Sequence, residues 1–290
     1  MDIVLKLLDG IWFVAFVAGI MILTNLVNAK GYFIPFYNFL QKKIKSKRLL
    51  VALISAVSGI LPVPGRVVIS AGVLDTLAPD DKRRKNYGIV NYLSTHHYYF
   101  WSPLEATVLI PLSVLSISYM KFMSLVGPLL LTVIGITLYY IFYVIKEEDI
   151  VINKIEYKKN QPIKNIKWDV VILTAIVIII GNALKIYSDT IVNFFMSYNS
   201  SIFFAGLVAF ITSFILGSSS KFAGITAILA SVIGINYLPL LFALGYSGYL
   251  ISPTHKCLII TKSYFDLDIK LYKILLIIST VLVTVGFLTT

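Results

Sequence analysis

Long apolar stretches without a charged residue alternate with short polar segments along the chain. Four of these stretches cover residues 10–29, 122–145, 190–220 and 222–254. A helix needs about 20 predominantly apolar residues to cross the hydrocarbon core of a bilayer. The pattern therefore predicts an all-α polytopic membrane protein with about six crossings.

Basic residues gather in three of the polar segments, at 42–48, 80–85 and 146–167. Loops rich in lysine and arginine stay in the cytoplasm during membrane insertion. The segment 188–200 contains neither residue, so we expect it on the outside. Counting crossings from these loops places both the N-terminus and the C-terminus outside, with the basic loops cytoplasmic and the chain in the plasma membrane as a multi-pass protein.

Two segments have lengths and flanks that predict re-entrant hairpins. Segment 49–78 has basic residues at both ends, and its two arms of about 13 residues would each span roughly 20 Å of helix, too little for a crossing. Pro-Val-Pro-Gly at 62–65 supplies a turn in the middle. Segment 201–235 has uncharged ends and Gly-Ser-Ser-Ser at 217–220, so we expect a second hairpin that enters from the outside.

The two halves of the sequence match weakly at an offset of 150 residues. The matched positions include Asn86-Tyr87 with Asn236-Tyr237, Tyr99 with Tyr249, and Ser102-Pro103 with Ser252-Pro253. Three crossings per half is an odd number, so the halves would be inverted. We expect one membrane domain with repeats 1–150 and 151–290, each ordered as helix, re-entrant hairpin, broken helix (86–118 and 237–266) and helix. Inverted repeats with broken helices are typical of secondary transporters.

A Ser-Pro pair interrupts each predicted broken helix. Proline is favoured at the first position of a helix and serine at its N-cap. Ser102-Pro103 and Ser252-Pro253 therefore predict the starts of new half-helices, with Glu105 completing a capping box after Ser102. Helix N-termini near the bilayer midplane favour an anionic ligand. The alternative is that each Ser-Pro pair is only a tolerated kink.

Charged residues at membrane depth are functional candidates because their desolvation is costly. Arg66 and Lys221 lie at the predicted hairpin tips, and His255 follows the second break. A structural role remains open for each; Arg66, for example, could pair with Asp75.

Two further residues are candidates for coupling to an ion. Glu105 and His96 could bind a proton or a cation, although His96 and His97 could equally belong to a packed aromatic cluster. The expected substrate-binding residues are Arg66, Ser102, Glu105, Ser218, Ser219, Ser220, Lys221, Ser252, Thr254 and His255.

Composition narrows the class of protein. Charged residues make up 13 % of the chain and hydrophobic residues 58 %, whereas a soluble domain has about 25 % charged residues. The net charge of +11 lies in short loops, so we expect no nucleic-acid partner. The single cysteine excludes an intrachain disulfide.

The sequence contains no motif for nucleotide hydrolysis, dinucleotide binding or a hydrolase nucleophile, so we expect a protein that is not an enzyme and has no cofactor. A metal site could only be assembled from distant residues, because no close ligand spacing such as H-E-x-x-H is present. These residues are His96, His97, Glu105, His255 and Cys257. From spacing alone, we predict no metal site.

The second break also carries a family resemblance. The residues that carry it are Ser252-Pro253-Thr254-His255-Lys256-Cys257-Leu258, followed by Thr261 and Tyr264-Phe265. From about Ser58 to the C-terminus the chain resembles an uncharacterised family of integral membrane proteins. That family is grouped with the ion transporter superfamily of arsenite, citrate, gluconate and dicarboxylate permeases.

The resemblance implies an elevator-type mechanism, in which hairpins and broken helices form a mobile transport domain against a scaffold, commonly in a homodimer. It points to the hairpin tips and Ser-Pro breaks as the site. The tips here differ from the Ser-Asn-Thr-like tips of sodium-coupled members, which leaves proton or sodium coupling open.

Together these features predict a secondary active transporter, a symporter or antiporter, for a small anionic solute. The alternatives are a polytopic membrane enzyme acting on a lipid or peptide, with His96, His97, Glu105 and His255 as its polar centre, or a channel or scramblase. The repeat favours transport, because an enzyme does not need matched sites from both halves.

Both ends of segment 49–78 are expected to face the cytoplasm. Cysteines introduced at Ser46 and at Asp81 should both resist an impermeant thiol reagent in intact cells, because basic residues flank the segment on each side. Labelling of only one of them from outside would contradict the hairpin and the inverted repeat with it.

Overall fold

The computed structural model describes residues 43–60, 66–79, 82–150, 201–265 and 270–290, together with Leu267 and a few isolated positions. Within these residues every regular element is a helix, so the all-α prediction is confirmed for the described part of the chain. The predicted first crossing at 10–29 and the hairpin tip at 62–65 lie almost entirely outside it.

The first half contains five described α-helices. They are α4 (Lys47–Ile60), α5 (Arg66–Leu77), α6 (Arg84–His96), α7 (Ala106–Val114) and α8 (Tyr119–Tyr139). Three short elements accompany them: the 3-10 turn η1 (His97–Phe100), the π-helical extension of α8, η2 (Tyr140–Val144), and η3 (Glu147–Asp149).

The second half also contains five described α-helices. They are α11 (Ile202–Leu216), α12 (Ser219–Ile233), α13 (Leu238–Ile251), α14 (Lys256–Phe265) and α15 (Lys270–Leu288), with the 3-10 turn η4 (Ile235–Tyr237) between α12 and α13.

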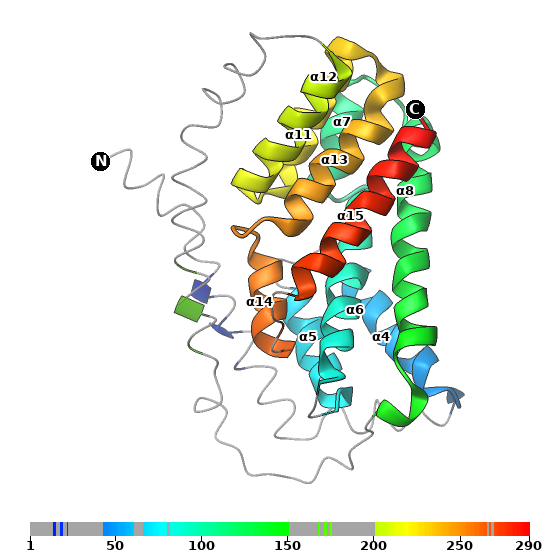
Figure 1. Cartoon of the computed structure of the whole chain (residues 1–290), viewed down its shortest axis with the longest axis vertical. Helices are drawn as coiled ribbons and strands as arrows, with labels where there is room; N and C mark the ends of the chain where they lie inside the picture. The colour runs from blue at the N-terminus through cyan, green and yellow to red at the C-terminus, as the bar shows by residue number, and fades with distance from the viewer. Residues whose placement is uncertain are drawn as a thin grey trace.

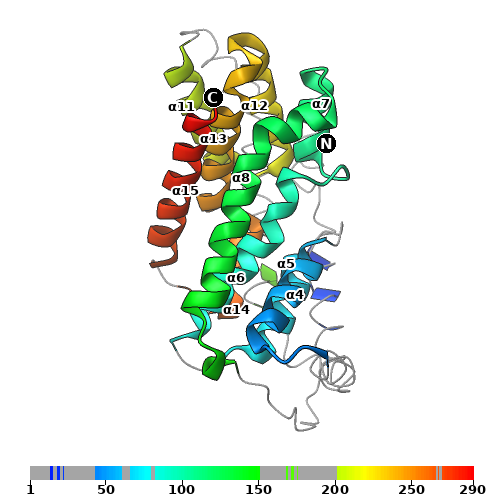
Figure 2. The same cartoon turned by 90° about the vertical axis from the view of Figure 1, so that its right-hand side faces the viewer.

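The helices form two groups, one at each end of the molecule (Figures 1 and 2). At one end, α11 and α12 pack against α13, and α7 packs against α12. At the other end, α4, α5 and α6 pack together, and α14 packs against α5 and α6. Each group therefore contains one helix from the other half of the chain. The long helix α8 runs along both groups, whereas α15 packs against α13 and α8 (Figure 1).

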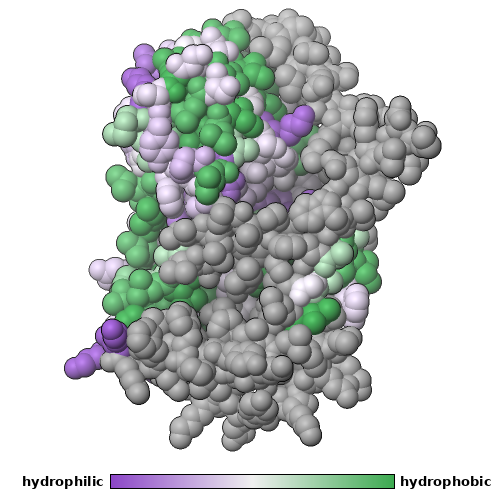
Figure 3. All heavy atoms as spheres, turned by 180° about the vertical axis from the view of Figure 1, so that it is seen from behind, coloured by the Kyte–Doolittle hydropathy of each residue, from purple (hydrophilic) through white to green (hydrophobic). Residues whose placement is uncertain are grey.

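Two described helices are long and apolar enough to cross a membrane. They are Tyr119–Val144, which joins α8 to its extension, and Leu271–Leu288 in α15. Large apolar side chains point outward from both, including Leu131 at 68 % exposure and Ile277 at 65 %. Figure 3 shows hydrophobic residues over much of the described part of the rear face. An apolar surface of this kind suits contact with lipid.

Described residues of the three basic segments meet at one end of the bundle. The backbone N–H of Lys47 donates to Glu147 at 2.9 Å, and the Arg48 guanidinium donates to the carbonyl of Ile145 at 3.0 Å. Arg83 pairs with Asp149. The start of α4, the start of α6 and the end of α8 thus lie together, as three loops on one side of a membrane would.

Asp75 near the end of α5 forms an ion pair with the neighbouring helix. It pairs with Arg84 at the start of α6. The pair joins the last turn of α5 to the first turn of α6, so it fixes the short connection between these two helices. The side chain of Arg66 lies outside the described part of the structure.

Close contact between α11 and α13 depends on glycine. A Cβ atom added at Gly248 would lie 2.2 Å from the carbonyl oxygen of Phe210, which belongs to the backbone and cannot move aside cheaply. Gly245 of the same helix faces α12, where an added Cβ would lie 2.6 Å from the Thr226 side chain. Small residues permit such close approach of helix backbones in membranes.

Gly248→Ala should lower the thermal stability of the protein in mild detergent. The clash with Phe210 would force α11 and α13 apart, at a cost of about 1–3 kcal/mol. Gly224→Ala is the matched control, because a Cβ there meets nothing within 4 Å. Equal melting temperatures for the two variants would show that the contact is not tight.

Candidate functional site

The two interrupted helices occupy matched positions in the chain. After α6 ends at His96, the chain makes a 3-10 turn and an irregular segment before α7 begins at Ala106. After α13 ends at Ile251, a shorter irregular segment leads to α14 at Lys256. The starts of α7 and α14 are 150 residues apart, as are Ser102 and Ser252, which are both buried.

The Ser-Pro pairs form turns and not helix caps. The carbonyl of Ser102 accepts from the N–H of Glu105 at 3.0 Å, and that of Ser252 accepts from His255 at 3.1 Å. Proline at the second position of such a turn has the φ angle that the turn requires. The half-helices α7 and α14 therefore begin three residues later than predicted. Ser102 and Ser252 are not the N-caps of these helices.

The capping box predicted for Glu105 is also wrong. Glu105 stands at the N-cap of α7 with an extended backbone, and its side chain makes no capping hydrogen bond. The Ser102 hydroxyl instead accepts from the N–H of Leu104 at 3.2 Å. The Ser252 hydroxyl accepts from Thr254 at the same distance.

The second break is tied to the loop between α11 and α12. The Ser252 hydroxyl donates to the carbonyl of Phe214 at 2.6 Å, and the Thr254 hydroxyl donates to that of Ile215 at 3.1 Å. Gly217 closes α11 with φ +53°, and a Cβ there would lie 2.3 Å from the Thr254 hydroxyl. Only glycine fits both the backbone conformation and the close approach. The structure therefore brings the predicted tip at Gly217 against the predicted break.

The first turn of α12 follows this loop directly. Ser218 is its N-cap residue, and the hydroxyls of Ser218 and Ser220 lie 3.3 Å apart. Lys221 stands in the same turn and is half-buried. Because α12 packs against α7, the helices that carry Lys221 and Glu105 are neighbours.

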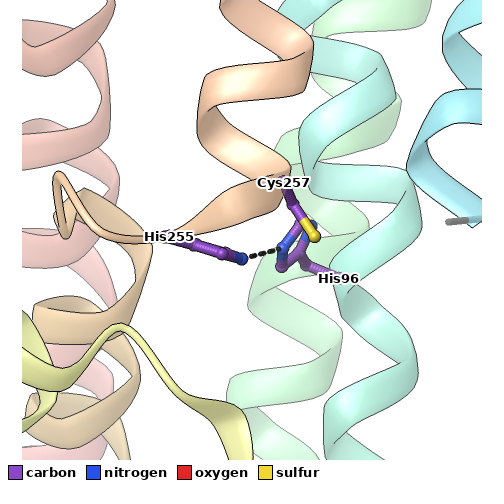
Figure 4. Close-up of side chains that lie close together, drawn as sticks. All are labelled: His96, His255 and Cys257. Atoms are coloured by element: carbon purple, nitrogen blue, oxygen red, sulfur yellow. Dashed lines mark hydrogen bonds between the residues drawn. The ribbon is translucent and has the colours of Figure 1, made fainter. Parts of the chain in front are cut away.

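Two histidines from opposite halves of the chain meet at the breaks. His96 is the last residue of α6, His255 immediately precedes α14, and both are almost completely buried. Their Nε2 atoms lie 3.2 Å apart (Figure 4). From the sequence, both residues are possible metal ligands and part of the polar centre of the alternative enzyme, but their spacing does not predict this contact.

The other ring nitrogen of each histidine contacts a backbone carbonyl. The Nδ1 atom of His96 contacts the carbonyl of Tyr92, and the Nδ1 atom of His255 lies 3.1 Å from the carbonyl of Tyr249. The Tyr92 hydroxyl donates to the carbonyl of Leu250 and lies 2.7 Å from His255 Nδ1. Because a carbonyl only accepts hydrogen bonds, we assign the proton of each neutral ring to Nδ1.

This assignment leaves an unprotonated Nε2 on each neutral ring. The two Nε2 atoms then face one another with lone pairs at 3.2 Å, which is unfavourable unless something positive lies between them. Such an arrangement could hold a shared proton or another cation between His96 and His255.

Aromatic rings surround the histidines, as the structural reading of His96 expected. Tyr99 and Tyr249, which are 150 residues apart, join their hydroxyls at 3.1 Å. The Tyr249 ring centroid lies 3.9 Å from that of His255, and the Tyr99 centroid lies 5.3 Å from that of His96. His97 has a different environment, since its ring stacks on Trp101 and accepts from the Trp101 indole N–H at 3.0 Å.

Sequence reasoning missed Tyr92 and Asn91. Tyr92 contacts both histidines, and Asn91 donates to Thr261 of α14 at 3.2 Å. The chain has 18 tyrosines, and nothing in the local sequence distinguishes Tyr92 from the others. A hollow of about 400 Å³ at the ends of α11 and α15 lies apart from these residues.

Ser252→Ala should destabilise the protein by about 1–3 kcal/mol, because the buried carbonyl of Phe214 would lose its hydroxyl donor. The measurement is thermal unfolding in detergent. Ser231→Ala is the control, since Ser231 is exposed and bonds only within its own helix turn. A Ser252 variant that melts with the parent would mean that the tie to α11 contributes nothing to stability.

Comparison with known proteins identifies a family but no activity. Residues 3–154 match a family model described as "Protein of unknown function (DUF401)". From the sequence, the family resemblance is expected to extend from about Ser58 to the C-terminus. The region that matches the family model lies mainly in the first half of the chain instead. No curated protein and no solved structure matches the chain.

The family description mentions no ion transporter superfamily, so that link stays a prediction. The match covers more than half of the 290 residues. The chain therefore belongs to the DUF401 family of proteins of unknown function.

Proposed function

We propose that this chain is a secondary active transporter of the elevator type, which carries a small anionic solute across the plasma membrane. The observation that supports it most is the matched pair of interrupted helices, with α7 and α14 beginning 150 residues apart inside the bundle. Interrupted helices in both halves of an inverted repeat form the substrate sites of many secondary transporters.

The helix contacts support an inverted repeat. The packing of α4 and α5 on α6 has its counterpart in α11 and α12 on α13. The contact of α7 with α12 has its counterpart in that of α14 with α5. The hydrogen bond between Tyr99 and Tyr249 is of the kind expected on a two-fold axis, where a residue meets its own counterpart.

Helix lengths support the two hairpins. The arms α4 and α5 have 14 and 12 residues, and α11 and α12 have 15 each. At 1.5 Å per residue these helices span about 18–22 Å, short of the roughly 30 Å of a bilayer core. The ends of the α4–α5 segment also lie with the basic residues near Asp149.

The loop between α11 and α12 supports an anionic substrate. The first N–H groups of a helix have no partner within that helix, and its N-terminus is positive. The starts of α12 and α14 lie close together because Thr254 bonds to Ile215 and contacts Gly217. Lys221 adds a charge in the first turn of α12, the same turn in which the hydroxyls of Ser218 and Ser220 lie 3.3 Å apart.

The remaining helices fit a scaffold. Helices α8 and α15 pack against each other and have exposed apolar faces, so we infer that they stay fixed in lipid and form a homodimer while the hairpins and broken helices move. The burial of His96 and His255 gives less support to a membrane enzyme, because a lipid or peptide would not reach them in this conformation.

Purified protein in proteoliposomes should take up at least one member of a panel of small anions when a proton or sodium gradient is imposed. Lys221→Ala should then weaken binding of that anion by one to two decades, about 1.4 kcal/mol per decade, because a charge-assisted hydrogen bond is lost. Lys121→Ala, an exposed lysine in the first turn of α8, is the control.

The same titration with Arg66→Ala completes the test. If Lys221→Ala and Arg66→Ala both bind as tightly as the parent, the anion assignment is wrong. Glu105 would then be the first candidate ligand for a cationic or neutral solute.

A further inference from the structure

Three potential metal ligands converge at the two breaks. One ligand atom each from His96, His255 and Cys257 lies within 4.8 Å of the others. Figure 4 shows the three side chains close together, with the His255 ring pointing toward the ring of His96. The whole chain has three histidines and one cysteine, so this cluster contains most of its nitrogen and sulfur ligands.

The two histidine rings are held by hydrogen bonds of the kind that orient metal ligands. In metal sites the ring nitrogen that does not bind the ion usually donates to a backbone carbonyl or another fixed acceptor. His96 and His255 both do so through Nδ1, toward Tyr92 and Tyr249. A tetrahedral ion with Zn–N bonds of 2.0–2.1 Å separates two nitrogen ligands by about 3.3 Å. The observed Nε2 separation is 3.2 Å.

We propose that His96, His255 and Cys257 bind a soft transition-metal ion, either Cu⁺ or Zn²⁺. Thiolate and imidazole ligands select these ions over Mg²⁺ and Ca²⁺, which prefer oxygen. With a thiolate and two neutral imidazoles, Cu⁺ gives a complex without net charge. Zn²⁺ leaves one positive charge and needs a fourth ligand. Because the histidines are buried, the charge balance favours Cu⁺.

The site joins the two halves of the chain. His96 ends α6, whereas His255 and Cys257 lie at the start of α14. A bound ion would link these helices across the breaks. The proposal does not depend on transport, since it concerns only what the cluster binds.

Alkylation of Cys257 provides a direct readout, because it is the only thiol and is half-buried. The full-length protein, purified in detergent through a tag without histidine and kept reduced, is titrated separately with Zn²⁺ and with Cu⁺. We expect one ion per chain and at least a tenfold slower reaction of Cys257 with a maleimide. The two titrations distinguish the ions.

Variants separate the cluster from unspecific binding. His96→Ala and His255→Ala should each abolish the protection of Cys257. His97→Ala should retain it, because His97 contacts Trp101 instead. Cys257→Ser should weaken binding measured by metal analysis. Tyr92→Phe removes the hydroxyl next to His255 Nδ1 without removing a ligand, and should lower the affinity by about 10–100-fold.

Three results would overturn the proposal. The first is that neither ion binds at one per chain in folded parent protein. The second is that His97→Ala loses protection as fully as His96→Ala does. The third is a reactivity of Cys257 that changes with pH but not with either ion, which would mean that the two histidines share a proton only. Size-exclusion profiles that match the parent confirm that each variant is folded.

Discussion

The structure depends on one constraint, which is that a helix interrupted inside an apolar bundle frees backbone carbonyls that water cannot reach. Such groups must find donors within the protein. Side chains at or near the two breaks supply them, both for the interrupted helices and for the end of α11. The pairs are Ser252 with Phe214, Thr254 with Ile215, Tyr92 with Leu250, His255 with Tyr249, and Thr107 with Tyr99. The polar residues at the breaks are therefore first of all structural, and any ligand site there is built from groups that already hold the backbone.

Because these polar groups already bond to the backbone, the orientation of the two histidine rings is set. His255 uses Nδ1 to satisfy a carbonyl, which turns its Nε2 toward His96. The same rule orients His96 through the carbonyl of Tyr92. The orientation of both rings thus follows from the backbone hydrogen bonds. The two breaks satisfy corresponding backbone carbonyls in the same way. The carbonyls of Tyr99 and Tyr249 each accept from a side chain at the start of the next half-helix.

The all-α class could be predicted from the apolar pattern, because long runs without charge favour helices, and the Ser-Pro pairs favoured an interruption of a helix. The exact helix starts could not, since Ser-Pro suits a turn as well as a helix N-terminus, and the turn formed at both Ser102 and Ser252. The meeting of His96 with His255 was beyond sequence reasoning for another reason. These residues are 159 positions apart, and only the packing of α6 against α14 brings them together. Metal sites are recognised in a sequence by the local spacing of their ligands, and local spacing does not indicate this contact.

The tie between the second break and the loop at Gly217 has a mechanical consequence. Two hydroxyls of the break are anchored to the last carbonyls of α11, and Gly217 leaves no space for slippage between them. The end of α11 and the entry to α14 therefore behave as a single rigid body. If the end of α11 moves, we expect the start of α14 to move with it. Any bending would then fall outside this unit, for example between α12 and η4, where Gly234 has a φ of +130°.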